Sequence, residues 1–269
     1  MKNILVIIAA AIWIAALPFF AEAQEAGCDA SCQAARKAQD PLAPISGVLT
    51  DFTSTYGPGS WDSDTRVDNY QFQPVHTFRN IGGGGGNLIV RGVIPVNSNP
   101  NMGERITGIG DSLVQGFYVP PGQGDGFKLG YGPQISLPTH SERELEGAGW
   151  GAGAVVVGFG GSGSLVYGGI LGHLWGENDV SSSLIQPIVF YNTSFLGGSY
   201  FGYSNSITYD WNASSGDRWN VPLGLTFGKA FVTKSNSVID ANFGFYTVPE
   251  RAGGAGDRQF KWAVSWILP

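Results

Sequence analysis

Three histidines, His76, His140 and His173, are the side chains of this chain best suited to move protons near neutral pH. Beside a serine and a third group that orients the ring, a histidine can activate a nucleophile for hydrolysis. His140 directly precedes Ser141, but no Gly-x-Ser-x-Gly sequence surrounds any of the three. The sequence therefore assigns no catalytic residue and predicts that the chain is not an enzyme, with hydrolysis kept as a minor alternative.

Two other features suggest binding chemistry. Cys28 and Cys32 are the only cysteines, and their spacing leaves a local disulfide or two free thiols as alternatives. A metal site would need further ligands, and no histidine lies nearby, so we expect no metal and no cofactor. The glycine run Gly82–Gly86 lacks the Lys-Ser/Thr pair of a phosphate-binding loop, so we interpret it as a flexible turn.

Polar and charged residues that alternate with apolar ones form the third set of candidates. Between residues 87 and 96, Leu88, Val90 and Ile94 share one parity and Arg91 has the other. A strand sends alternate side chains to opposite faces, so such a segment has one apolar and one polar face. These polar residues have two possible roles, which the sequence leaves open: they line a solute path, or they pair with one another. The members of this polar set are Arg91, Lys128, Gln134, Gln186, Asp210, Arg218, Asn220, Asp240 and Asn242.

The final segment, residues 258–268, shows this alternation most clearly. Phe260, Trp262, Val264, Trp266 and Leu268 share one parity, while the other parity includes a lysine. An apolar, aromatic face is suited to lipid, and a polar face is suited to a wet interior. Strands can cross a bilayer only when they close into a barrel, because an open edge leaves backbone groups unpaired. The inner face of a soluble β-sandwich is the alternative, since alternation alone marks only a half-buried strand.

The composition favours the membrane barrel. Charged residues make up 13% of the 269 residues, against about 25% in ordinary soluble domains. Glycine is abundant, at 41 residues, and aromatic residues reach 13%. The net charge of −6 argues against a nucleic-acid partner, which would require a basic surface.

The chain divides into three parts. Residues 1–23 have the basic start, the apolar run and the small-x-small site of a cleaved signal peptide. Residues 24–45 form a short periplasmic helix and linker, the helix stopping at Pro41. Residues 46–269 form an all-β, closed antiparallel transmembrane β-barrel of about 12 strands. The expected strands are 48–56, 66–78, 87–96, 107–119, 127–137, 150–158, 165–175, 183–192, 200–211, 218–228, 238–247 and 258–268.

The connections between these strands indicate an orientation. With the N-terminus in the periplasm, the odd-to-even connections face outward, and they hold about half of the acidic residues, including Glu142, Glu144 and Glu146. Barrels of this type usually carry their longer loops outside. We therefore expect the protein in the cell outer membrane, with outer-membrane lipid, lipopolysaccharide and the barrel assembly machinery as its partners.

Several segments carry a resemblance to a known family. They are ARKAQDPLAPISGVLTDF after the leader, GIGDSL from Gly108, GAGWGAGAVVV from Gly147, SLIQPIVFYN from Ser183, and SITYDW followed by GDRWNVPLGLTFGKAF. This pattern, over nearly the whole mature chain, resembles the outer-membrane proteins named for the MetA pathway of phenol degradation. The resemblance implies an outer-membrane barrel that passes small hydrophobic or aromatic compounds, and it implies no catalytic residues. The Cys28/Cys32 pair departs from the family pattern.

Three functions remain open from the sequence. The first is a passive channel or transporter for small molecules, and the second is a closed barrel that is structural or presents its loops outside. A bore of twelve strands lies between filled eight-stranded barrels and open sixteen-stranded porins, so size alone does not choose between these two. The third, minor function is an outer-membrane lipid hydrolase, which would require a serine and a histidine within hydrogen-bond distance on the barrel.

Overall fold

A computed structural model describes residues 30–57, 65–101, 103–123, 126–193, 198–253 and 255–268. The signal peptide expected over residues 1–23 and Cys28 lie outside these described residues. Within the described ranges, no helix combines the length and the apolar character that a membrane-crossing helix needs.

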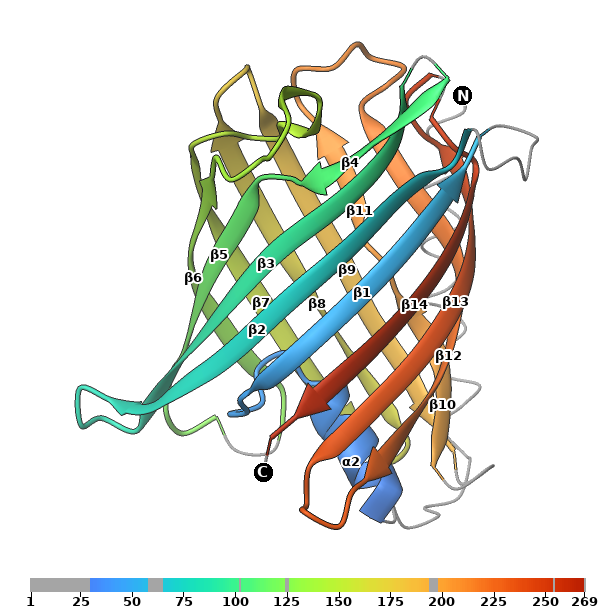
Figure 1. Cartoon of the computed structure of the whole chain (residues 1–269). Helices are drawn as coiled ribbons and strands as arrows, with labels where there is room; N and C mark the ends of the chain where they lie inside the picture. Colours follow the sequence, from blue (N-terminus) through green and yellow to red (C-terminus); the bar gives the residue numbers. More distant parts are fainter. Residues whose placement is uncertain are drawn as a thin grey trace.

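The chain forms one short helix and a single antiparallel sheet that closes on itself (Figure 1). The closure joins the first strand to the last, because β1 pairs with β2 on one side and with β14 on the other. The elements are α2 (Ala30–Gln39), β1 (Gly47–Tyr56), β2 (Val67–Ile81), β3 (Gly86–Asn101), β4 (Glu104–Ile109), β5 (Ser112–Val119), β6 (Lys128–Leu137), the 3-10 turn η3 (Arg143–Leu145), β7 (Gly151–Ser162), β8 (Leu165–Gly176), β9 (Ser181–Asn192), β10 (Ser199–Ser204), β11 (Ile207–Asp210), β12 (Trp219–Val232), β13 (Val238–Glu250) and β14 (Arg258–Ile267).

The fourteen segments make twelve spans, which confirms the predicted fold. β4 and β5 both pair with β3, so they are two halves of one span interrupted at Gly110 and Asp111. β10 and β11 likewise share β9 and β12 as neighbours. The interruption at Gly110 and Asp111 explains why the alternation over residues 107–119 is ambiguous in sequence, because the pairing restarts between β4 and β5.

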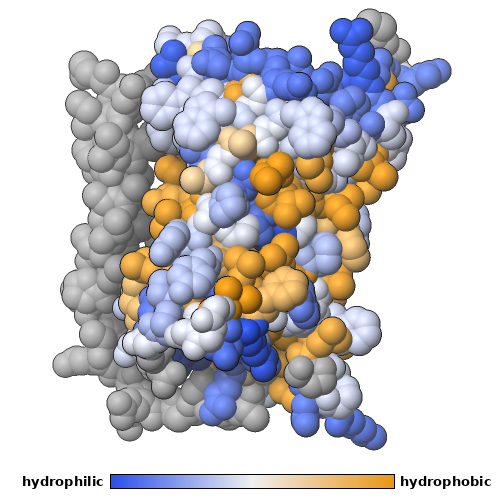
Figure 2. Space-filling view, turned by 90° about the vertical axis from the view of Figure 1, so that its left-hand side faces the viewer, coloured by the Kyte–Doolittle hydropathy of each residue, from blue (hydrophilic) through white to orange (hydrophobic). Residues whose placement is uncertain are grey.

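The outer surface of the barrel is apolar in its middle. On β14, Trp262, Val264 and Trp266 are 39%, 38% and 55% exposed, whereas Ile267 is fully buried on the opposite face. This exposure confirms the alternation predicted for the last strand. Figure 2 shows an apolar belt around the middle of one side and hydrophilic residues gathered at one end. Such a belt matches the hydrocarbon layer that a membrane barrel must face.

The two ends of the barrel differ in their connections. One end, here called the loop end, carries the β6–β7 connection with η3 and the β11–β12 and β13–β14 connections (Figure 1). The other, the turn end, carries α2 and tight connections such as the glycine run between β2 and β3. Gly82, Gly83 and Gly85 have φ angles of 69°, 73° and 82°, a conformation that glycine adopts without strain. This run is a turn, as its sequence predicts.

The helix and the segment after it lie inside the barrel at the turn end. Residues 30–46 are here called the N-terminal plug. Ala35 is fully buried, and Leu42 and Ile45 are 2% and 8% exposed, within one core cluster that includes residues from the inner wall of the barrel. Figure 1 shows α2 at this end of the barrel. The helix ends at Gln39, before Pro41, because proline cannot continue the backbone hydrogen bonds.

Candidate functional site

The inner wall formed by β1 to β3 changes from buried to partly exposed toward the loop end. Inward-facing Val75, Thr77 and Ile89 are buried at 9% exposure or less, beside the N-terminal plug. Further toward the loop end on the same strands, Gln73 and Arg91 are partly exposed. The accessible part is here called the vestibule, and Asp51, Asn69, Gln71, Gln73, Arg91 and Asn97 line it on β1 to β3.

A ladder of amide side chains runs along one wall of the vestibule. The Nε2 of Gln73 donates to Oε1 of Gln71 at 2.9 Å. Gln71 in turn donates to Asn69 at 3.0 Å, and Asn69 donates to Asn97 on the next strand at 2.6 Å. Residues two apart on a strand share a face, which is why 69, 71 and 73 can form this ladder. The ladder gives the vestibule a neutral, hydrogen-bonding wall.

Arg91 lies where the vestibule meets the buried core. Its Nε donates to Oε1 of Gln115 at 2.9 Å, and its Nη2 donates to the same oxygen. Gln115 donates to Gln134 at 2.8 Å, and Gln134 donates to the backbone carbonyl of His173 at 2.9 Å. The guanidinium carbon is 5.7 Å from the centre of the Phe117 ring. Arg91 and Gln134, both predicted from alternation, are thus brought together through Gln115.

Two other inward-facing cations of the spanning strands have carboxylate partners. Lys261 Nζ is 2.6 Å from Asp51 Oδ2, across the seam between the last and first strands. Lys128 Nζ is 3.0 Å from Asp40 Oδ2 in the N-terminal plug. These pairs hold the barrel wall and the plug together, so the structure places Lys128 in a structural ion pair.

The other six predicted residues are dispersed. Gln186 donates to Ser204 at 3.3 Å on the inner face. Asp210 is exposed at the end of β11, where its carboxylate accepts the backbone N–H of Asn212 at 2.9 Å.

Arg218 lies in the loop before β12 and donates to a backbone carbonyl at 3.0 Å, while Asn220 is the second residue of that strand. Asp240 is 5% exposed near the turn end, and Tyr200 donates to it at 2.7 Å. Asn242 is its neighbour, at 3.4 Å. Alternation predicts which face a residue occupies, but it does not predict its depth along the barrel.

Hydrogen bonds fix the N-terminal plug to the wall at several points. Gln39 and Asn192 exchange two amide hydrogen bonds of 3.0 and 3.1 Å, both buried. Thr77 on β2 donates to the carbonyl of Ile45 at 2.6 Å. Since buried polar groups that lose a partner are costly, these bonds specify one position for the plug.

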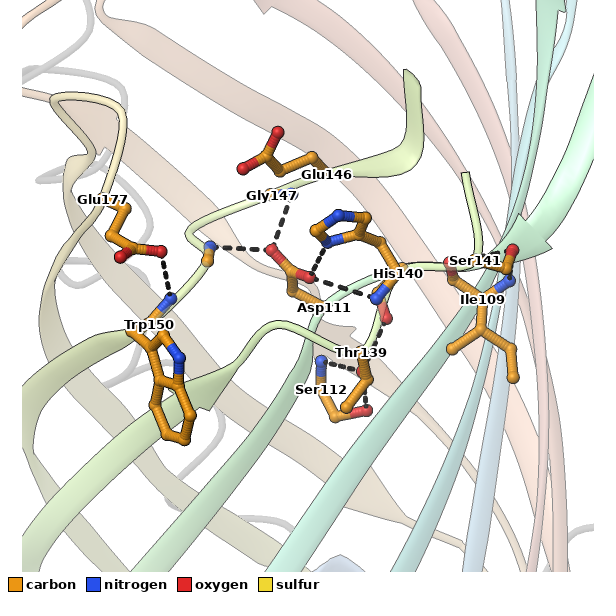
Figure 3. Close-up of polar contacts among 12 residues, drawn as sticks. Ile109, Asp111, Ser112, Thr139, His140, Ser141, Glu146, Gly147, Trp150 and Glu177 are labelled. Atoms are coloured by element: carbon orange, nitrogen blue, oxygen red, sulfur yellow. Dashed lines mark hydrogen bonds and ion pairs between the residues drawn. The ribbon is translucent and has the colours of Figure 1, made fainter. Parts of the chain in front are cut away.

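At the loop end, Asp111 fastens the β6–β7 connection (Figure 3). Its carboxylate accepts the ring Nδ1–H of His140 at 2.7 Å and the backbone N–H groups of Gly147 and Gly149 at 2.9 and 2.7 Å. Burial alone would raise the pKa of Asp111, but these bonds and the His140 backbone N–H outweigh it and hold the pKa below its ordinary value. Leu145 in this connection is 4% exposed, packed near Gly108 of β4.

The same connection is tied to the next loop. Glu177, just after β8, accepts the backbone N–H of Trp150 at 3.0 Å (Figure 3). Asn178 donates to Glu146 at 2.7 Å. The β6–β7 and β8–β9 connections therefore form one hydrogen-bonded cap on part of the loop end.

Two histidines do have serine partners, which bears on the hydrolase alternative. His76 Nδ1 is 2.9 Å from the hydroxyl of Ser46, and His173 Nδ1 is 2.8 Å from that of Ser183. The described residues provide neither ring with a carboxylate, while His140, which has one, has no serine hydrogen-bonded to its ring. The parts of a catalytic triad are thus divided between different histidines. His173 also stacks edge-on against Trp175 at 4.2 Å, which fits a position in an interfacial aromatic band.

Cys32 is disulfide-bonded, and it lies in α2 at 7% exposure. Cys28, the other cysteine of the chain, lies outside the described residues. Across the part of the chain that the structure describes, no three His, Cys, Asp or Glu side chains come together as a metal site would require.

The geometry defines a closed antiparallel β-barrel of the outer-membrane type. A crystal structure of an outer membrane channel from Pseudomonas putida F1 has a similar fold, with a TM-score of 0.58 and 13% sequence identity. The likeness covers 85% of this chain and 98% of that one. No protein-family model and no curated protein matches the sequence.

Sequence reasoning missed the amide ladder and Gln115. The signal for part of the ladder is present in Asn69, Gln71 and Gln73, which alternate with Tyr70 and Phe72. Gln115 is the polar member of a largely apolar stretch, where the interruption in its span hides the parity.

Proposed function

We propose that the protein is a passive channel or transporter for small molecules in the outer membrane. The observation that carries this proposal is the vestibule, a solvent-accessible interior lined by polar side chains and surrounded by an apolar outer belt. A barrel whose only role was mechanical would have no need for a hydrogen-bonding inner wall that water can reach. The fold shared with a solved outer membrane channel supports the proposal.

The proposed orientation places the loop end outside the cell and the plug on the periplasmic side. Longer loops on the outer side are usual for such barrels. The proposal includes export through a cleaved signal peptide, contact with outer-membrane lipid and lipopolysaccharide, and insertion by the barrel assembly machinery. The solutes suggested by the resemblance to the phenol-degradation family are small hydrophobic or aromatic compounds.

The N-terminal plug favours a second candidate, a closed structural barrel. Its side chains fill the interior at the turn end, and buried hydrogen bonds hold it there. The two candidates differ in whether solute ever passes the plug.

Planar bilayers distinguish them. The channel predicts discrete conductance steps from the refolded mature chain, and these steps should grow in a variant that lacks residues 24–45. If both proteins are silent although both migrate as folded barrels, transport is excluded. If only the shortened variant conducts, the full chain is a closed barrel under those conditions.

A further inference from the structure

Arg91 differs from Lys128 and Lys261, the two inward-facing cations described above, in the charge of its partners. Both of its hydrogen bonds go to one neutral amide oxygen, that of Gln115, and no carboxylate lies within ion-pair distance among the described residues. Its Nη1 has no hydrogen-bond partner in the same described set. Lys128 and Lys261, by contrast, are neutralised by Asp40 and Asp51.

The relay behind Arg91 holds its position. The amide of Gln115 points its oxygen at the guanidinium because its N–H groups are engaged by Gln134, which is itself fixed by a backbone carbonyl. A uniformly neutral relay orients the cation without compensating its charge. A cation held within a barrel wall is costly when it is unpaired, so the site favours an anion that completes it.

The surroundings of Arg91 are apolar on the plug side. Phe117 lies under the guanidinium at 5.7 Å and is 2% exposed. Val75, its partner on β2, and Ile89, two residues before it on β3, belong to the buried core. These side chains are buried, but Val93 on β3 and its partner Leu113 on β5, on the same inner face as Arg91 and Gln115, are half-buried. They give the vestibule an apolar wall beside one uncompensated positive charge.

We propose that Arg91 binds the carboxylate of a small organic acid whose apolar body lies against this apolar wall. A guanidinium can donate two parallel hydrogen bonds to a carboxylate, and here the Nη1 edge is available. The inference rests on the proposed function, because it names the class of solute that the vestibule would take. It distinguishes acids with an apolar body from neutral aromatic compounds and from small acids, such as acetate, that lack such a body.

The test measures equilibrium binding by calorimetry to the full mature chain, refolded in zwitterionic lipid nanodiscs. The probes are benzoate, benzyl alcohol and acetate, which separate the charge from the apolar body. We expect benzoate to bind most tightly and Arg91→Gln to weaken it by roughly tenfold or more, the usual effect of losing a hydrogen bond to a charged group. Arg91→Lys should retain part of the binding, because lysine keeps the positive charge but lacks the paired, planar N–H donors of a guanidinium.

The matched control is Arg79→Gln, which removes a positive charge at the turn end, outside the vestibule, where Arg79 donates to the carbonyl of Pro44. It makes the same change in net charge as Arg91→Gln. Its benzoate affinity should stay within about twofold of the parent protein, and all variants are first checked for heat-modifiable migration. If Arg91→Gln does not fold, the Arg91→Lys variant and the three probes still decide the question.

Several outcomes would overturn the proposal: equal affinity for benzoate and benzyl alcohol, equal affinity for benzoate and acetate, or benzoate binding that is unchanged in Arg91→Gln. Binding does not require passage, so the function and the inference fail separately. Arginine-dependent binding by a barrel that never conducts would support the inference and remove the channel. Conductance without such binding would support the channel and remove the inference.

Discussion

Lys261 Nζ lies 2.6 Å from Asp51 Oδ2, and this pair joins β14 to β1, where the barrel closes. Their side chains are only 14% and 18% exposed, so each charge depends on the other for compensation. Asp51→Ala should therefore lower the free energy of unfolding by roughly 1–3 kcal/mol, since it leaves a charge without its partner. The double replacement Asp51→Asn with Lys261→Gln should cost less. Urea unfolding in lipid vesicles measures both free energies. A double variant less stable than the single variant would contradict this account.

Substitutions on the two faces of β14 should differ sharply. Val264 is 38% exposed on the outer face, whereas Ala263 lies opposite Asp51 on the inner face. Val264→Arg should lower the free energy of unfolding by about 2–4 kcal/mol if residue 264 lies near the bilayer midplane. The loss should be at the lower end of this range if the residue lies closer to an interface. Ala263→Arg should fold and change the conductance, because it adds a charge to the interior. Heat-modifiable migration after refolding in lipid tests both, and the reverse order would invert the assignment of faces.

The Asp111–His140 contact predicts a pH dependence for the β6–β7 connection. The folded pKa of Asp111 is depressed, so its contribution to docking is complete above the ordinary carboxyl pKa of 3.8 and is lost as the pH falls through the lower folded value. The connection should therefore stay docked down to about pH 4. In Asp111→Asn, protease cleavage within residues 138–150 should increase at neutral pH. The control is Asp217→Asn, in a different loop, which should leave this cleavage unchanged.

The plug should become more mobile when its buried amide pair is broken. Asn192→Leu leaves the Gln39 amide without its two hydrogen bonds to Asn192. This should reduce the free energy that holds the plug in place by roughly 1–3 kcal/mol. We expect conducting openings in bilayers to become more frequent and hydrogen exchange over residues 30–46 to speed up. Arg79→Ala, which removes only an exposed bond to Pro44, is the control. Unchanged exchange in Asn192→Leu would show that apolar packing alone holds the plug.

The Ser183–His173 contact should have no catalytic role. Ser183 also accepts the indole N–H of Trp211 at 2.9 Å, and the described residues give the histidine ring no orienting carboxylate. Phospholipid hydrolysis by the refolded protein should stay at background and be the same in Ser183→Ala. Hydrolysis that disappears in Ser183→Ala and persists in Ser46→Ala would establish the hydrolase instead.

What the sequence by itself determined is which residues form strands and which face each side chain takes. The positions of Trp262, Val264 and Trp266 follow from a period of two, which is a local property of the extended backbone. The same rule separates Arg91 from Leu88 and Val90. It failed where a span is interrupted, as at Gly110 and Asp111, because alternation presumes an unbroken strand.

Only the tertiary structure decided which polar residues meet. Lys128 finds its carboxylate at Asp40, 88 residues away, while Arg91 meets an amide instead. Such pairings depend on the register between neighbouring strands and on where the N-terminal plug comes to rest, and neither is written in the periodicity of any one segment. The sequence alone shows that Arg91 is charged. That its partner is an amide and not a carboxylate is a property of the whole closed barrel.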